Sequence, residues 1–508
     1  MSWSRRQVLG GLGAAAAVGV GWRSTAGATA TRPLQRALVG CTRYRVLEIY
    51  LAGGLSHRET LWVEGPDALP TWRRMDGVTS RVWEDRVAMA QVANLDQWTW
   101  PFLGGVRFGP AFSSVAWHPM MQRMRLVATR HDLDPHVAAG ALTLGGLPIG
   151  RTRMAGLGAV IQRRYGSASD PVSFVIAPRA ERTYTQFMAE PGVHGAANRP
   201  IVVRLGTSMQ TDLQRFWQPA AHLANVDALH AFYRDRFAAR MAYPGVGPAR
   251  SEGFDAYDAA MSRLLQAPAL QARLAAGPSL TNLPALPGES SSVGVAIGMG
   301  AYLLSTGARY AGVIDTGVCE PYDTHYDNYG DLDRHALVHN GNLYHVLSAI
   351  REQINDGVLD LDETLVIVRS EFGRYWSGQP NPRGTNHWPA GYCTLLIGGP
   401  VDAPGLAGTL QDAGDDQADD LVARGGPSGQ GFSPTDLRAA TLLAAGIDPF
   451  DPDCLWVNET TYQLPGNPPL DPAVARQEIA SDVLGVGLTA LQSTCPNDID
   501  PSDAMEDA

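Results

Sequence analysis

The chain of 508 residues contains no lysine, so all 40 of its basic residues are arginine. Without lysine, neither a Schiff-base intermediate nor the lysine of a phosphate-binding loop is available. A GC-rich genome explains the bias more simply than function does. The formal net charge of −11 argues against a protein that wraps nucleic acid, because such a protein needs a strongly basic surface.

Cysteine is also scarce, and no apolar run in the body of the chain is long enough to span a bilayer. The spacing of the cysteines matches no zinc knuckle. In an oxidising compartment Cys454 and Cys495 could close a C-terminal loop, although the sequence does not choose a pairing. The five cysteines are Cys41, Cys319, Cys393, Cys454 and Cys495.

The N-terminus has the features of an export signal. Arg5 and Arg6 precede a short Gly/Ala-rich apolar region, and small residues follow near Ala28 and Ala30. This pattern predicts a twin-arginine signal peptide over residues 1–30, read by the twin-arginine export machinery. We therefore expect a periplasmic or secreted protein; the alternative is a disordered basic arm.

Short apolar runs alternate with helical patterns along the rest of the chain. Near-continuous apolarity is typical of strands buried on both faces, so the pattern predicts an α/β fold with a central, mostly parallel sheet flanked by helices. The expected strands are 44–54, 124–130, 173–178, 199–205, 309–315, 363–370 and 392–399. The expected helices are 227–242, 254–275, 293–307, 335–356 and 433–447, the last capped by Ser433 or Thr435.

The domain limits follow from composition. We expect a main domain over 31–460, with a helical insertion at 207–285 that ends in a Pro/Gly/Ser-rich linker. The segment 461–508 is expected to form a C-terminal helix and an acidic, disordered tail. The acidic loop DAGDDQADD is interpreted as solvated surface rather than as a calcium site.

Acid and histidine side chains follow three of the expected strands. In open α/β sheets, ligands bind beyond the carboxyl ends of the strands. Residues i and i+2 of an extended segment point to one side, so Asp323 and His325 can reach the same ion. With Glu371 and His387 they form a ligand set suited to Zn²⁺ or Mn²⁺, and less to Ca²⁺. His136 is a further candidate ligand.

Each of these residues also has a structural alternative. Asp323 and Thr324 could form an Asx-type turn, Glu371 could pair with Arg374, and His136 could simply begin a helix. His335 and His339 are spaced i, i+4, which can bind zinc, but no adjacent acid completes that motif, and a packed or solvated helix face is favoured. Only the joint pattern favours a metal site.

The same segments resemble a known family. YLAGGLSHRET, YDTHYDN, SEFGRYW, GTNHW and TDLRAATLLAAGIDP match, in order and spacing, motifs of twin-arginine-exported bacterial proteins of unknown function in the alkaline phosphatase and sulfatase clan. The resemblance covers roughly residues 44–450. It implies an alkaline-phosphatase-like fold with Asp323, His325, Glu371, His387 and His136 at metal-ligand positions.

Two departures from the family pattern affect the expected chemistry. Asn386 replaces the usual aspartate before His387, and no clear aspartate follows the first strand. One divalent ion (Zn, Mn or Ca) is therefore expected rather than two. No residue lies in a recognisable nucleophile motif, and Ser56 is a weak candidate.

These observations lead to a hydrolase hypothesis and a rival. The first is an exported metal-dependent hydrolase of phosphate or sulfate esters, with Arg374 offsetting charge on the transferring group. Its partner would be a small-molecule or polymer ester, with no nucleic acid. The rival is a non-catalytic exported binding or assembly protein that retained the fold. The sequence does not determine the substrate or the oligomeric state.

Overall fold

An eight-stranded sheet forms the centre of the structure, a computed structural model. Its order is β12-β4-β11-β8-β1-β7-β5-β6. β11 is antiparallel to both of its neighbours, and every other pairing in the sheet is parallel. The mostly parallel α/β sheet expected from the sequence is confirmed. The strands are β1 (Arg45–Leu51), β4 (Met124–Thr129), β5 (Ser173–Ala177), β6 (Ile201–Arg204), β7 (Tyr310–Asp315), β8 (Thr364–Ser370), β11 (Tyr392–Gly398) and β12 (Gly405–Ala407).

The structure describes most, but not all, of the chain. Several expected features lie outside these residues: the segment 1–30, the acidic tail, most of the acidic loop, and every cysteine except Cys393, which is buried and free on β11. The described residues are 44–63, 100–146, 155–166, 173–177, 182–192, 195–204, 223–241, 249–277, 292–318, 321–325, 332–375, 385–412, 421–426, 429–450 and 471–493.

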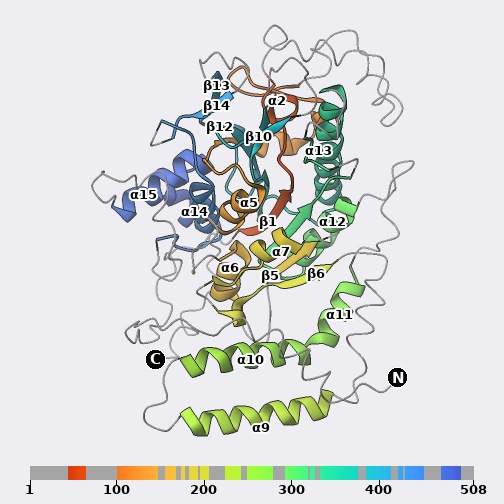
Figure 1. Ribbon diagram of the computed structural model, residues 1–508, viewed down its shortest axis with the longest axis vertical. Helices are drawn as coiled ribbons and strands as arrows, with labels where there is room; N and C mark the ends of the chain where they lie inside the picture. The colour runs from red at the N-terminus through yellow and green to blue at the C-terminus, as the bar shows by residue number, and fades with distance from the viewer. Residues whose placement is uncertain are drawn as a thin grey trace. The chain divides into compact units, whose positions relative to one another are not determined.

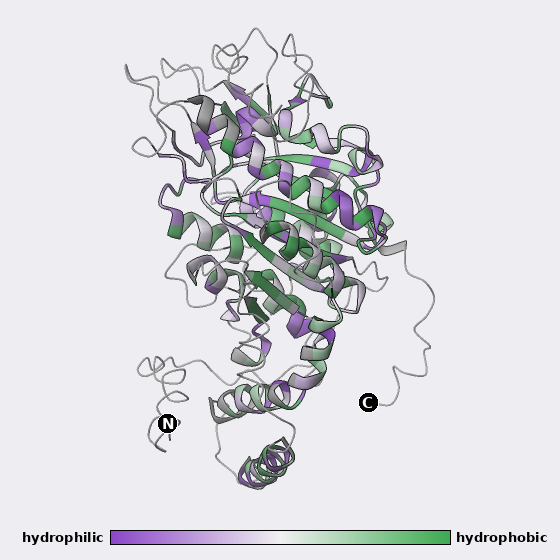
Figure 2. Ribbon diagram, turned by 90° about the vertical axis from the view of Figure 1, so that its right-hand side faces the viewer, coloured by the Kyte–Doolittle hydropathy of each residue, from purple (hydrophilic) through white to green (hydrophobic). Residues whose placement is uncertain are grey.

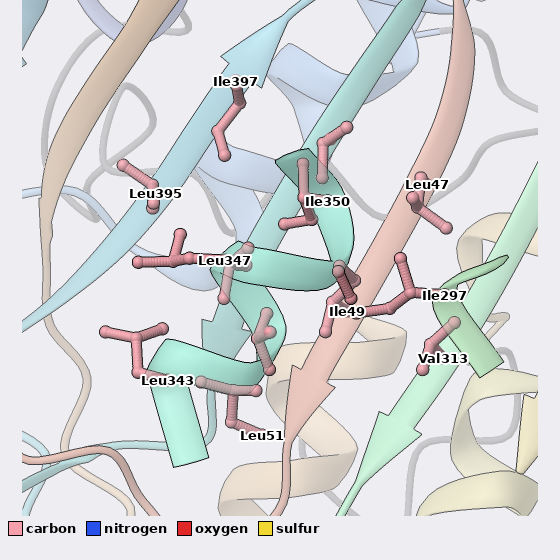
Figure 3. Packing of buried hydrophobic residues seen from close by; sticks show 14 of the residues in the cluster. Leu47, Ile49, Leu51, Ile297, Val313, Leu343, Leu347, Ile350, Leu395 and Ile397 are labelled. Carbon is pink, nitrogen blue, oxygen red and sulfur yellow. The ribbon is translucent and has the colours of Figure 1, made fainter. Parts of the chain in front are cut away.

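Helices cover both faces of the sheet (Figure 1). On one face, α12 (Ser292–Ser305) and α13 (Leu332–Asn355) pack against β1, β7, β8 and β11. Figure 3 shows Leu343, Leu347 and Ile350 of α13 lying over Leu47, Ile49 and Ile397. The other face is covered by α5 (His136–Gly145), α6 (Leu157–Tyr165), α7 (Arg182–Met188), α14 (Pro434–Ala444) and α15 (Pro472–Ile479).

The two cores explain why the strands lack polar–apolar alternation. Successive residues of β1 face opposite layers, so Leu47 and Ile49 enter one core while Val46 and Tyr50 enter the other. Both faces are dry, and the strands are accordingly among the most hydrophobic parts of the ribbon in Figure 2. The seven sequence-predicted strands are all present, and β12 is the strand of the eight-stranded sheet that the sequence did not predict.

A buried ion pair lies within this apolar interior. Glu48 on β1 is 1% exposed, and it is neutralised by Arg369 of the neighbouring β8. Its second oxygen accepts a 2.8 Å hydrogen bond from the Tyr310 hydroxyl on β7. A buried carboxylate needs both charge and hydrogen-bond compensation, and these three strands supply it.

Helices also fill the described part of the expected insertion. They are α9 (Leu223–Met241), α10 (Ala249–Leu265) and α11 (Ala267–Ala275). The sequence predicted a single helix over 254–275, which is wrong: the helix breaks at Gln266. Pro268 has no backbone N–H and its ring disfavours a preceding helical turn, so a new helix begins there.

The start of α14 agrees with its sequence signal. The Ser433 side chain accepts a hydrogen bond from the Asp436 backbone, and Asp436 accepts one from the Ser433 backbone. This capping box confirms Ser433 as the cap, whereas Thr435 donates to Gly146 O instead.

All the described residues belong to one compact unit, Arg36–Ala508. Among the described helices, none is both long and apolar enough to cross a membrane. The remaining short elements are α2 (His57–Thr60), β2 (Trp100–Pro101), β3 (Arg107–Phe108), η2 (Pro110–Ser114), η3 (Pro119–Arg123), η5 (Ala196–Asn198), β9 (Gly373–Tyr375), β10 (Asn386–Trp388), β13 (Thr409–Asp412), β14 (Leu421–Arg424), η7 (Ala480–Leu484) and α16 (Leu488–Ser493).

Candidate metal centre

One edge of the sheet gathers the candidate residues. The carboxyl ends of β1, β4, β7 and β8 all lie at this edge, because these strands run in the same direction. His136 follows β4, Asp323 and His325 follow β7, and Glu371 follows β8 directly. β11 runs the opposite way, so its amino end brings His387 to the same edge. The topology thus brings candidate ligands together from segments far apart in the sequence.

Four side chains converge there: His136, Asp323, His325 and His387. Each offers one ligand atom, and these atoms lie within 4.8 Å of one another. Asp323 Oδ1 is 3.0 Å from His325 Nε2 and 3.2 Å from His136 Nε2. The Nε2 atoms of His325 and His387 are 2.8 Å apart. We call this set the four-ligand group.

The geometry of the four-ligand group suits a small divalent cation. Ligands about 2.0–2.1 Å from a tetrahedral ion lie roughly 3.3 Å from each other, close to the separations seen here. His136 Nε2 is shielded from solvent and makes no hydrogen bond of acceptable geometry, even though Asp323 is near. A buried imidazole nitrogen that has no hydrogen bond and lies near three other ligand atoms fits a metal.

Two carboxylates orient the imidazoles from behind. Glu371 Oε1 lies 2.8 Å from His136 Nδ1, and Asp134 Oδ1 lies 3.1 Å from His387 Nδ1. With a proton on Nδ1, each imidazole donates a hydrogen bond to its carboxylate, and its Nε2 faces the four-ligand group. This is the arrangement by which outer carboxylates fix metal-binding histidines.

Glu371 itself lies outside the four-ligand group, although the sequence suggested it as a direct ligand. Its side chain is fully buried. Oε1 also accepts hydrogen bonds from the Gly53 backbone at 2.7 Å and from the Tyr184 hydroxyl at 2.9 Å. In the structure Glu371 Oε1 thus contacts the Nδ1 side of His136, and its role as a direct ligand stays a prediction.

The protonation states differ within the four-ligand group. Burial lowers the pKa of His136, but its contacts with Asp323 and Glu371 outweigh burial and raise it to about 9. Burial, together with the positive charges of His136 and Arg374, lowers the pKa of His387 to about 4. Near neutral pH, His387 is neutral and ready to bind a metal, whereas His136 must release a proton first.

Arg374 is buried against Asp323. Its Nη2 donates to Asp323 Oδ1 at 2.5 Å and to the carbonyl of Gly53. Burial raises the pKa of Asp323, but the nearby His136 imidazole and the charge of Arg374 hold it well below its usual range. Arg374 is 1% exposed, so it faces Asp323 rather than solvent.

The glycine pair after β1 permits this close packing. Gly53 has a φ of +121°, and a Cβ there would lie 2.7 Å from the Asp323 backbone nitrogen. Gly54 has a φ of +89°, and its Cβ would lie 2.7 Å from the Phe372 ring. Only glycine tolerates both the backbone angles and the contacts.

Ser56, the suggested nucleophile, lies in another network. Its side chain is 1% exposed and donates to Glu59 Oε2 on α2. Its backbone N–H donates to His339 Nδ1 at 3.2 Å. His335 and His339 are also fully buried, as a packed helix face, and they are not part of the four-ligand group.

The sequence did not reveal several supporting residues. Asp134 lies two residues before His136, a spacing that could have drawn attention to it. Tyr184 on α7 and His131, whose Nε2 lies 2.5 Å from Glu371 O, carry no such signal. Their roles depend on how separate segments meet.

The fold and the four-ligand group together describe an α/β protein with a candidate metal centre at the carboxyl edge of its sheet. The chain belongs to the family described as Protein of unknown function (DUF1501), whose model matches residues 43–451. The resemblance to a family of unknown function is confirmed, while the assignment of its ligands stays a prediction.

The chain was also compared with curated proteins and with solved structures. No curated protein matches the chain. Among solved structures, two histidine mutants of TAB5 alkaline phosphatase with bound magnesium match at 9% and 10% identity. Each match covers 72% of this chain and 94% of the other, with TM-scores of 0.28 and 0.29. Similarity at this level supports no inference about activity.

Proposed function

We propose that this protein is an exported metal-dependent hydrolase of phosphate or sulfate esters. The observation that supports it is the four-ligand group, in which three imidazoles and one carboxylate approach within 4.8 Å and His136 Nε2 is buried without a hydrogen bond. A metal ion in such a group would act as a Lewis acid and generate a nucleophile from water, which is the chemistry that ester hydrolysis needs.

The ligand chemistry narrows the choice of ion. Imidazole nitrogens suit Zn²⁺ and related transition metals, whereas Ca²⁺ takes about six to eight oxygen ligands. The set of His136, His325, His387 and Asp323 therefore favours Zn²⁺, then Mn²⁺, over Ca²⁺. A bound ion of this kind would polarise the ester oxygen and lower the pKa of a bound water.

The protein residues supply orientation and charge. Glu371 and Asp134 hold the Nδ1 protons of His136 and His387, which keeps both Nε2 atoms aimed at one point. Arg374 fixes Asp323 Oδ1 in the same place. Because Ser56 is buried and bonded to Glu59, the nucleophile in this proposal is water rather than a protein hydroxyl.

The proposal also includes the cellular location of the protein. Arg5 and Arg6 ahead of a short apolar region support export through the twin-arginine route to the periplasm or beyond. Fusion of residues 1–30 to a reporter checks this: export should stop when both arginines are changed to lysine. Unchanged export of that variant contradicts the route.

Activity is tested with full-length protein matured through export and supplied with Zn²⁺, Mn²⁺ or Ca²⁺. A panel of aryl phosphate mono- and diesters and aryl sulfates should show metal-dependent hydrolysis that His387→Ala abolishes. His345→Ala, on the half-buried side of α13, is the matched control and should retain activity. No hydrolysis of any ester with any of the three ions contradicts the proposal.

The rival function is a non-catalytic exported binding or assembly protein. The buried state of Ser56 and of Arg374 favours it, because neither side chain is available to a substrate. It predicts that Asp323→Ala and His387→Ala fully complement a deletion strain. Loss of complementation by these variants, with normal protein levels, excludes it.

A further inference from the structure

Thr324 connects the four-ligand group to a second, fully buried network. It lies between Asp323 and His325, but its own side chain points to the other side of the segment and is 0% exposed. Its Oγ1 is 2.7 Å from His335 Nδ1, 3.1 Å from His339 Nε2 and 3.2 Å from Thr385 Oγ1. Both histidines belong to α13.

The proton on His339 can be placed from its partners. The Ser56 backbone N–H donates to His339 Nδ1, so that nitrogen carries no proton. Burial lowers the pKa of His339 well below its ordinary value, so the ring is neutral. The single ring proton is therefore on Nε2, where it donates to Thr324 Oγ1.

Every contact of the Thr324 hydroxyl can then be satisfied at once. His339 Nε2 donates to Oγ1, and His335 Nδ1 and Thr385 Oγ1 are the partners of the hydroxyl proton and of the second lone pair. The Thr385 hydroxyl in turn donates to the Thr324 carbonyl at 3.1 Å. The backbone N–H of Thr385 donates to the same carbonyl at 2.9 Å.

These bonds join the two ligand-bearing segments. Thr324 is flanked by Asp323 and His325, and Thr385 is two residues from His387. The segments are 61 residues apart in sequence, yet three hydrogen bonds link the two threonines directly. The spacing of three of the four ligands thus depends on Thr324 and on the α13 histidines behind it.

A catalytic role for the Thr324 hydroxyl is a weaker explanation. The order Thr324, His335, Glu59 has the composition of a catalytic triad, and Glu59 Oε2 lies 3.7 Å from His335 Nε2. However, the hydroxyl is fully buried, and its proton and both lone pairs already have partners. A nucleophile needs access to substrate, whereas an anchor needs this saturation.

We infer that Thr324, held by His335 and His339 of α13 and joined to Thr385, is a positioning residue that sets the metal geometry of the four-ligand group. The inference rests on the proposed function, because it requires that the group bind a metal. It assigns a role to the buried histidine pair that the hydrolase mechanism itself does not use.

The test compares Thr324→Val, which keeps the shape but removes the hydroxyl, with Thr324→Ser, which retains it. Thr441→Val, at a buried threonine whose hydroxyl donates to Leu437 O within α14, is the matched control. Zn²⁺ affinity is measured by competition with a chelating indicator. The geometry is followed in the visible absorption spectrum of the Co²⁺-loaded protein.

We expect Thr324→Val to weaken Zn²⁺ binding by about 10- to 100-fold and to change the Co²⁺ spectrum, as losses in outer-shell support do. Thr324→Ser and Thr441→Val should keep the wild-type affinity and spectrum. A Thr324→Val protein with unchanged affinity and spectrum overturns the inference while leaving the metal centre intact. A wild type that binds neither metal contradicts the proposed centre, and the inference with it.

A second variant covers the case in which Thr324→Val does not fold. Thr385→Val removes the partner on the other segment, so it should weaken Zn²⁺ binding and shift the Co²⁺ spectrum in the same sense. Where both singles fold, the double variant should lose less than the product of the two separate effects, because they break one shared contact. A double variant whose loss equals the product of the two single losses contradicts the link between the segments.

Discussion

At the residue scale, the chemistry of the site depends on side chains behind the ligands as much as on the ligands. Glu371 is buried and makes three contacts, to His136, Tyr184 and the Gly53 backbone. It fixes the tautomer and direction of His136, and it draws the Gly53 turn against the end of β8. Its effect on metal binding is therefore indirect.

Replacing Glu371 with glutamine tests this indirect role. The amide keeps the size but lacks the charge that orients and polarises His136, so Zn²⁺ affinity should fall by about 10- to 100-fold. Competition titration with a chelating indicator measures the loss. Glu352→Gln, a half-exposed acid on α13, is the control and should bind normally. Stoichiometric binding at wild-type affinity in Glu371→Gln contradicts the role.

Buried His57 gives a second prediction at this scale, on stability against pH. Burial, followed by the charge of Arg58, lowers the pKa of His57 to about 3. Between the unfolded pKa near 6.5 and about 3, the unfolded chain binds more protons than the folded chain. Stability should therefore fall as the pH drops through this window, by up to about 1.4 kcal/mol for each pH unit from this group.

His57→Gln removes that titration, so the slope of unfolding free energy against pH should decrease between about pH 6.5 and 3. Denaturant unfolding at a series of pH values measures it, with His345→Gln as the control. An unchanged slope in His57→Gln would show that the group does not contribute.

At the element scale, the site is made by strand ends and the tight turns after them. Gly53 and Gly54 follow β1, and their positive φ angles let the Asp323 segment and Phe372 approach the turn closely. β9 and β10 form a short ribbon in which Arg374 lies opposite His387. These backbone features bring groups from β1, β7, β8 and β11 to one point.

Substituting Gly53 with alanine tests the turn. The added Cβ would lie 2.7 Å from the Asp323 backbone nitrogen, so the Asp323 segment must move, and Zn²⁺ binding should be lost. Gly357→Ala is a matched control, because its φ is +68° and a Cβ there meets nothing within 4 Å. That control carries only the backbone strain, of order 1 kcal/mol, and should bind Zn²⁺ normally. Equal binding in both variants contradicts the account.

Much of this arrangement could be predicted from sequence, and the reasons are physical. Buried strands such as β8 have unbroken β-branched runs, and the rule that ligands gather at carboxyl strand ends singled out Asp323, His325 and His387. The three residues of β12 are too few to produce such a signal. The same rule put Glu371 at the correct edge of the sheet. Which neighbour its carboxylate contacts depends on tertiary packing, which the sequence pattern does not reveal.

At the scale of the whole molecule, strand order decides which ends meet. β1 lies between β7 and β8, and reversed β11 pairs with β8, so four loops distant in sequence share one edge. Helical layers on both faces keep this sheet dry, and the ligands are placed on a rigid support. Export in a folded state, as the N-terminal arginines predict, would allow the metal to be bound before translocation.

The central claim is that His136, Asp323, His325 and His387 bind one divalent ion. The most direct measurement is the metal content of folded protein purified through its native export route, by mass spectrometry of the elements. We predict about one Zn²⁺ or Mn²⁺ per chain, and almost none in folded His387→Ala. Wild-type protein without either metal after supplementation, or equal content in both proteins, would contradict the claim.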